Sequence, residues 1–126
     1  MIIAVDFDGT IVEHQYPKIG KDVPFAIETL KLLQKDGHQL ILWTFRCGKE
    51  LDDAVNYCLE RGVEFYAVNK SYPEEIFDNT TSRKIHADIY IDDRNLGGLF
   101  EWTIAYGLIS GKKAEMKKKS FFSFLR

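Results

Sequence analysis

The stretch Ile2-Ile3-Ala4-Val5-Asp6-Phe7-Asp8-Gly9-Thr10 decides the fold of this chain. Four consecutive apolar residues are typical of a short strand that is covered on both faces. Asp8-Gly9 is a common turn sequence, but Asp6 stands directly at the strand end and has no role in such a turn. The apolar stretch is too short for a signal peptide or a membrane span, and we therefore expect a cytoplasmic protein.

Further apolar runs predict three more strands, at Gln39–Trp43, Glu64–Val68 and Ala87–Ile91. Apolar residues at helical spacing predict helices between and after them, at Pro24–Lys35, Leu51–Leu59 and about Gly98–Ile109. This alternation predicts an α/β fold, a Rossmann-like three-layer sandwich with a mostly parallel sheet of at least four strands and no cap domain. The fourth strand alternates apolar and polar residues, which favours an edge position beside the first strand.

Length and composition indicate one globular domain. The chain has 126 residues, of which 45% are apolar and 29% charged, enough for one hydrophobic core. We divide it into a core of residues 1–111 and a basic and aromatic tail of residues 112–126. A net charge of −2 gives no overall signal for binding to nucleic acid or to an anionic membrane. Two cysteines do not make a disulfide framework.

Acidic or hydroxyl side chains stand at the ends of three predicted strands: Asp6 with Asp8, Thr44, and Asp92 with Asp93. Ligands of open α/β sheets bind beyond the carboxyl ends of the strands, where these residues would meet. Two carboxylates that leave one strand can converge on one point. Asp6 is then a candidate nucleophile toward a phosphoryl group, and Asp8 a candidate acid and base.

The pair Asp92-Asp93 indicates a metal site. Adjacent like charges are unfavourable unless a cation or a hydrogen-bond network compensates them. Carboxylate ligands that remain open to water and phosphate suit Mg²⁺ better than zinc. We expect the ion to bind Asp6, one or both of Asp92 and Asp93, and a backbone carbonyl near Asp8. The alternative is that the pair opens a helix, where Asp is common.

Other residues are weaker candidates for contact with a phosphate. The hydroxyl of Thr44 can donate to a phosphoryl oxygen, and either Lys84 or Lys70 could neutralise its charge. Arg46 is a candidate clamp for a second anionic group, or a helix-capping or surface arginine. Two turn residues, Gly9 and Thr10, complete the candidate substrate contacts.

Taken together, these residues resemble the haloacid dehalogenase superfamily of phosphohydrolases over about Ile2 to Asn95. The matching motifs are Asp6-Phe7-Asp8-Gly9-Thr10, the strand end at Thr44, the upstream lysine, for which Lys84 fits better than Lys70, and the paired acids Asp92-Asp93. The resemblance implies that Asp6 is the nucleophile and a Mg²⁺ ligand. It also implies that Asp8 protonates the leaving group, activates water and binds the metal through its carbonyl. An acid at this second position is typical of the phosphatases of the superfamily.

The gaps at residues 9–23 and 69–84 are too short for the cap domain that most such enzymes carry. A capless site is open and suits large phosphorylated substrates, such as phosphoproteins or nucleic-acid ends, unless the subunits of an oligomer cover one another's sites. Two alternatives to an enzyme are a receiver-like signalling domain and a catalytically silent phosphate-binding module. In a receiver domain the nucleophile would follow the third strand, where this chain has Val68-Asn69-Lys70.

Overall fold

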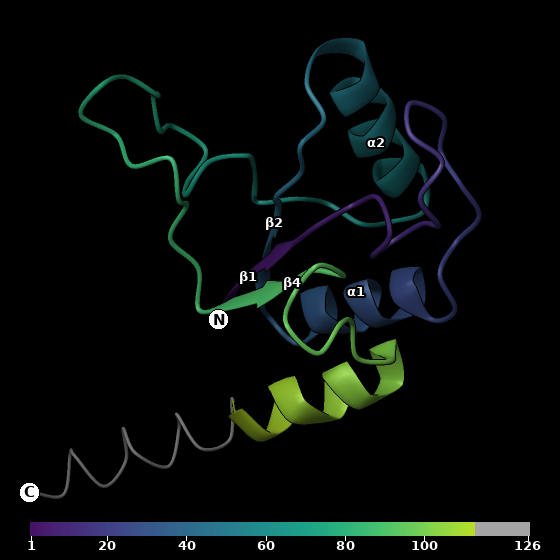
Figure 1. The fold of residues 1–126 in the computed structure, drawn as a ribbon. Coiled ribbons are helices and arrows are strands. Elements are labelled where there is room, and N and C mark those ends of the chain that lie inside the picture. The colour runs from purple at the N-terminus through teal and green to yellow at the C-terminus, as the bar shows by residue number, and fades with distance from the viewer. Residues whose placement is uncertain (113–126) are drawn as a thin grey trace, which may run out of the picture.

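The structure is a computed structural model that describes residues 1–112. Its elements alternate along the chain as β1 (Ile2–Val5), α1 (Ala26–Lys35), β2 (Gln39–Leu42), α2 (Gly48–Glu60), β3 (Ala67–Val68) and β4 (Ile89–Ile91). A further helical segment covers residues 102–112 (Figure 1). The predicted tail lies outside the described residues from position 113 onward.

The four strands form one parallel sheet in the order β3-β2-β1-β4. This confirms the predicted α/β class, and β4 occupies the predicted edge position beside β1. The chain moves from β1 through β2 to β3 and then returns to the other side of β1. The strand order therefore reverses at β1, which is where ligands bind in sheets of this kind.

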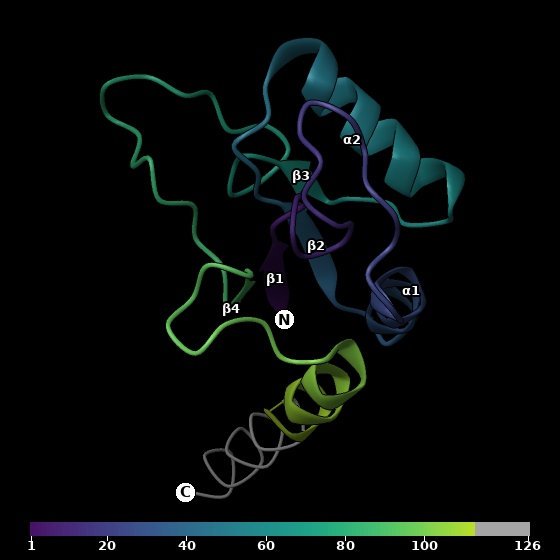
Figure 2. The ribbon, with the colours of Figure 1, turned by 45° about the vertical axis from the view of Figure 1, so that its right-hand side comes forward.

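The helices α1 and α2 and the segment 102–112 pack against the same face of the sheet (Figure 2). The core on this face contains Leu30 and Leu33 from α1, Cys58 from α2, and Trp102 and Ile109 from the last helical segment. In α1, the buried apolar residues Ala26, Ile27, Leu30 and Leu33 recur at helical spacing on one side of the helix. The helical periodicity thus turns the apolar side of each helix toward the strands. The carboxyl ends of the strands stay uncovered.

The second face of the sheet is covered by the connection 69–88 instead of a helix. A right-handed return from β3 to β4 has to cross this face. Figure 2 shows the loop on the side of the sheet away from α1 and α2. Its buried Ile85 packs against Ala4, Ile41 and Ala67. This face is the thinner side of the molecule.

Neither gap that could hold a cap domain contains one. The residues between β1 and α1 form a short flap that is closed by isolated bridges from Asp8 to Val12 and from Val12 to Asp22. The β3–β4 connection is the loop described above. In residues 1–112, no helix combines the length and apolar character needed to cross a membrane. Because neither gap holds a cap domain, the carboxyl edge of the sheet is open.

Candidate active site

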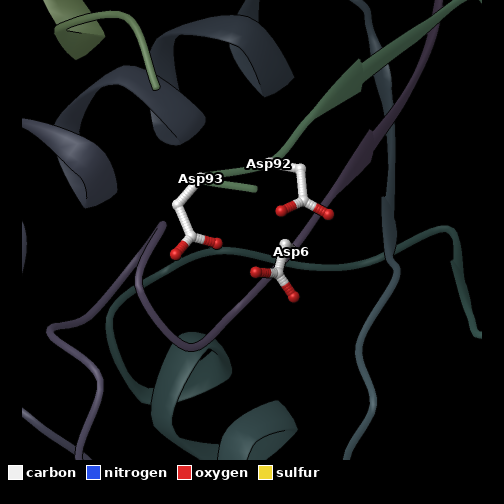
Figure 3. A group of neighbouring side chains, drawn as sticks. All are labelled: Asp6, Asp92 and Asp93. Atoms are coloured by element: carbon white, nitrogen blue, oxygen red, sulfur yellow. The ribbon is translucent and has the colours of Figure 1, made fainter. Parts of the chain in front are cut away.

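Three carboxylates meet at the carboxyl ends of β1 and β4. Asp6 follows β1, Asp92 and Asp93 follow β4, and one oxygen of each lies within 4.8 Å of the others (Figure 3). The strand ends are level because Val5 pairs with Ile91. The strand pairing thus brings together the acids predicted to share a metal, and both members of the Asp92-Asp93 pair belong to the cluster.

Within residues 1–112, the three carboxylates of this cluster form no ion pair with a described cation. Burial, and then repulsion from Asp92, raises the pKa of Asp6 from 3.8 to about 7. Three converging carboxylate oxygens without an ion-pair partner fit a hard divalent cation such as Mg²⁺.

We expect the contribution of Asp6 to make the metal-free protein less stable as the pH rises from about 4 to about 7. The carboxyl of Asp6 titrates near 3.8 in the unfolded chain and near 7 in the folded protein. In this interval the folded state holds the extra proton, so raising the pH favours unfolding. Mg²⁺ binding requires the ionised form and should raise the melting temperature more at about pH 8 than at about pH 5. Thermal melts in EDTA and in Mg²⁺ measure both effects.

In Asp6→Asn the part of this pH dependence that comes from Asp6 should disappear. A pH dependence of the melting temperature in EDTA that is the same in the unaltered and Asp6→Asn proteins would contradict the assigned environment of Asp6.

The turn after β1 supports the acid cluster. Thr10 is fully buried, and its hydroxyl accepts a hydrogen bond from the backbone N–H of Asp93 at 3.0 Å. The same hydroxyl lies 3.3 Å from Oδ2 of Asp6 and 3.4 Å from Oδ1 of Asp93, and can donate to one of them. Thr10 therefore positions the carboxylates from behind, whereas the sequence suggested that it contacts substrate.

Gly9 also belongs to this support of the acid cluster. Its φ of +82° favours glycine, and a Cβ at this position would overlap the carboxylate of Asp93. We expect Gly9→Ala to displace Asp93, lower the melting temperature and weaken Mg²⁺ binding by about tenfold or more. Thermal melts and calorimetric Mg²⁺ titration would measure both.

Gly107→Ala is the matched control, because Gly107 lies in a helical segment and a Cβ there meets no described atom within 4 Å. It should leave Mg²⁺ binding unchanged and keep or raise stability. Equal Mg²⁺ affinity in the Gly9→Ala protein would contradict the role of this turn.

Asp8 is held by Arg46 at the side of the acid cluster. Nε of Arg46 donates to Oδ2 of Asp8 at 2.7 Å and Nη2 donates to Oδ1 at 2.8 Å, which is a bidentate pair. The hydrogen bond to Asp8 raises the pKa of Arg46 further above its ordinary value. Each oxygen of Asp8 retains a second lone pair that can accept a further hydrogen bond.

All five N–H groups of Arg46 have acceptors. Besides Asp8, its guanidinium donates to the carbonyl oxygens of Pro17, Lys18 and Glu50, and the side chain is only 1% exposed. A guanidinium has five donors, and since all five are already used here, none is left for a second anionic group. Arg46 is thus neither a free clamp nor a surface residue. It joins Asp8 to the flap and to α2.

Thr44 lies at the predicted place and faces the cavity. Its hydroxyl oxygen accepts a hydrogen bond from the backbone N–H of Arg46 at 3.1 Å, which leaves the hydroxyl proton for another acceptor. The backbone N–H of Thr44 donates to Oδ1 of Asn69 at 2.8 Å. Asn69 has a positive φ of 54° at the end of β3. Asn69 has no predicted role, although an Asn directly after a predicted strand is a signal for one.

The structure brings neither predicted lysine into the cavity. The ammonium of Lys84 lies 5.4 Å from the ring centre of Tyr90, which packs on the second face of the sheet. Lys70 donates to the carbonyl of Pro73. The additional cation at the cavity is Arg94, whose backbone N–H donates to Asp92 at 2.9 Å. Because Arg94 directly follows the acid pair in the sequence, it could have been predicted as a residue of the site.

These groups line one open cavity of about 430 Å³, a size that accommodates a small ligand. Its lining includes acids, cations and aromatic side chains: Asp6, Asp8, His14, Tyr16, Trp43, Thr44, Phe45, Arg46, Asp92 and Arg94. The arrangement places one candidate nucleophile, one held carboxyl group and a cation site around a common space.

One solved structure is closely similar to this chain. The structure of a conserved protein coded by a locus of Bacteroides thetaiotaomicron is 60% identical in sequence and has a TM-score of 0.84. The match covers 89% of this chain and 91% of that chain. No protein-family model and no curated protein matches the sequence. The chain belongs to the same family as the Bacteroides protein.

Proposed function

We propose that this protein is a Mg²⁺-dependent phosphatase of the haloacid dehalogenase type, which hydrolyses phosphomonoesters through an aspartyl-phosphate on Asp6. The observation that carries the proposal is the cluster of Asp6, Asp92 and Asp93 within 4.8 Å at the reversal of strand order. Asp8 lines the same cavity, so a nucleophile and an acid lie beside a cation site.

In the first step, a carboxylate oxygen of Asp6 attacks the phosphorus and the bond to the leaving oxygen breaks. The carboxyl group of Asp8 gives its proton to that oxygen, and the alcohol departs. In the second step, water attacks the phosphorus of the aspartyl-phosphate while Asp8 takes a proton from it. Inorganic phosphate leaves and the Asp6 carboxylate is restored. Arg46 keeps Asp8 in place through both steps.

Mg²⁺ would be held by Asp6, Asp92 and Asp93 and, when bound, neutralises charge and polarises the phosphoryl oxygens. The hydroxyl of Thr44 can donate to one of those oxygens. We place the activity in the cytoplasm, where thiols stay reduced, because Cys47 and Cys58 are both free. The open cavity suits a phosphate group on a substrate that extends beyond the site.

Hydrolysis of p-nitrophenyl phosphate tests the proposal. We expect turnover in Mg²⁺, loss of turnover in EDTA, and recovery when Mg²⁺ is returned. Asp52→Asn is the matched control, since Asp52 is exposed on α2 and outside the cavity, and it should behave like the unaltered protein. Activity that survives EDTA undiminished would exclude the metal-dependent mechanism.

A further inference from the structure

We propose that the substrate is a nucleotide, with its phosphate at the acid cluster and its base against the side chains of Phe45 and Tyr16. That the nucleotide is hydrolysed rests on the proposed function, but binding of the nucleotide can be measured separately. Support for this binding comes from a feature that the phosphatase chemistry does not use. Aromatic side chains, from Tyr16, Trp43 and Phe45, line the same cavity as the carboxylates.

Phe45 is an apolar side chain held out into solvent. It is 99% exposed, yet the residues on both sides of it are fixed. The backbone N–H of Thr44 donates to Asn69 at 2.8 Å, and the backbone N–H of Arg46 donates to Thr44 at 3.1 Å. A fixed backbone beneath a fully exposed ring gives a preformed surface that a flat ligand can cover with little loss of conformational entropy.

Tyr16 is a second preformed aromatic surface, on the flap. The guanidinium of Arg46 lies 5.1 Å from its ring centre, so a buried cation covers part of the ring. The flap residues that follow, Pro17 and Lys18, are bound to Arg46 through their carbonyl groups. The tyrosine nevertheless stays 48% exposed. One buried arginine therefore anchors both segments that present aromatic side chains.

The remaining lining favours a nucleobase over the plain ring of a phosphotyrosine. His14 and Arg94 also line the cavity, and their polar groups can meet the hydrogen-bonding edges of a base, which a phenyl ring lacks. A nucleotide carries both a phosphate and a base, and this one cavity is lined both by half-buried acids and by exposed rings. The open mouth leaves room for a free mononucleotide or for the terminal nucleotide of a single strand.

Binding to the Asp6→Asn protein in Mg²⁺ tests the inference without turnover. The probes are thymidine and adenosine 5′-monophosphates, ribose 5-phosphate and phosphotyrosine. Their binding is measured by calorimetry or by quenching of the tryptophan fluorescence, to which Trp43 in the cavity and Trp102 in the core both contribute. We expect the nucleotides to bind about tenfold or more tightly than ribose 5-phosphate, because stacking of a base on an aromatic ring contributes on this scale. Equal affinity for the two, or tighter binding of phosphotyrosine, would overturn the inference.

Variants of exposed phenylalanines assign the effect to the cavity. Added to the Asp6→Asn protein, Phe45→Ala should reduce the preference for nucleotide over ribose 5-phosphate by about tenfold. Phe77→Ala, at a ring that is 65% exposed in the 69–88 loop, should leave that preference unchanged. A preference that survives Phe45→Ala intact would contradict the proposed base site.

The outcomes separate this inference from the proposed function. If the unaltered protein hydrolyses ribose 5-phosphate as well as it hydrolyses nucleotides, and binding shows no preference, the phosphatase proposal stands and the nucleotide site is wrong. If nucleotides bind as expected and nothing is hydrolysed, the nucleotide site stands and the phosphatase proposal fails. A comparison of thymidine 5′-monophosphate with a short 5′-phosphorylated oligonucleotide distinguishes a free nucleotide from a strand end.

Discussion

Replacement of Asp6 by Asn is expected to lower kcat by at least about a thousandfold, the scale at which loss of a nucleophile acts in covalent enzymes. The amide cannot attack phosphorus as a carboxylate does, and it is a poorer ligand for Mg²⁺. The fold should be kept, because the substitution also removes a charge that is repelled by Asp92 and whose burial raises its pKa to about 7. Steady-state hydrolysis at saturating Mg²⁺ and a thermal melt in EDTA measure the two effects.

A single-turnover experiment identifies the step that is lost. With a substrate labelled at phosphorus and an acid quench, the unaltered protein should retain label as an acyl phosphate that hydroxylamine releases. The Asp6→Asn protein should retain none, while Asp52→Asn should behave as the unaltered protein. A normal rate in Asp6→Asn, or label retained at an unchanged level, would remove Asp6 from the mechanism.

Arg46→Lys should have the second largest effect, with kcat lowered by about a hundredfold, the lower end of what general acid catalysis contributes. Lysine keeps the charge, but its ammonium cannot bind both oxygens of Asp8 and three backbone carbonyls at once. The free energy of unfolding should fall as well. A buried ion pair that loses one partner outright costs about 3 kcal/mol, and Arg46→Lys should cost less because lysine keeps the charge. Hydrolysis rates and denaturant unfolding measure these changes.

The leaving group shows whether Arg46 acts through Asp8. p-Nitrophenolate departs without a proton, whereas an alkyl alcohol needs one, so Arg46→Lys should slow alkyl phosphates more than p-nitrophenyl phosphate. Arg83→Lys, at an exposed residue of the 69–88 loop, is the matched control and should change neither rate. An equal loss on both substrates would point to general misfolding instead of a misplaced acid.

The acid cluster could be predicted from the sequence because its geometry follows from local rules. A buried strand that ends in Asp6, and a second one that ends in Asp92-Asp93, must meet if the two strands are parallel neighbours. The pairing of Val5 with Ile91 supplies that condition. Strand boundaries were less accurate: Glu64–Val68 was predicted as a strand, whereas β3 covers only Ala67–Val68, where it pairs with β2 on one side.

The environment of Arg46 could not be predicted, because most of its acceptors lie in two segments that are distant in the sequence, at Asp8 and at Pro17-Lys18. Nothing in the sequence shows that the carbonyl groups of Pro17, Lys18 and Glu50 turn toward one guanidinium. The positions of Lys84 and Lys70 could not be predicted for a related reason. Their positions depend on the path of the 69–88 loop, and an irregular loop has no periodicity from which that path can be inferred.

The loop that crosses the second face of the sheet also bears on how this family can diversify. Its length is not set by a helix that has to match the sheet, and each doubling of a flexible loop adds only about 0.6 kcal/mol of closure entropy. Residues can therefore be inserted at its exposed part, around Phe77, without moving Ile85 or the strands that hold the acids. A lineage could lengthen this segment into a lid over the cavity while Asp6, Asp92 and Asp93 stay unaltered.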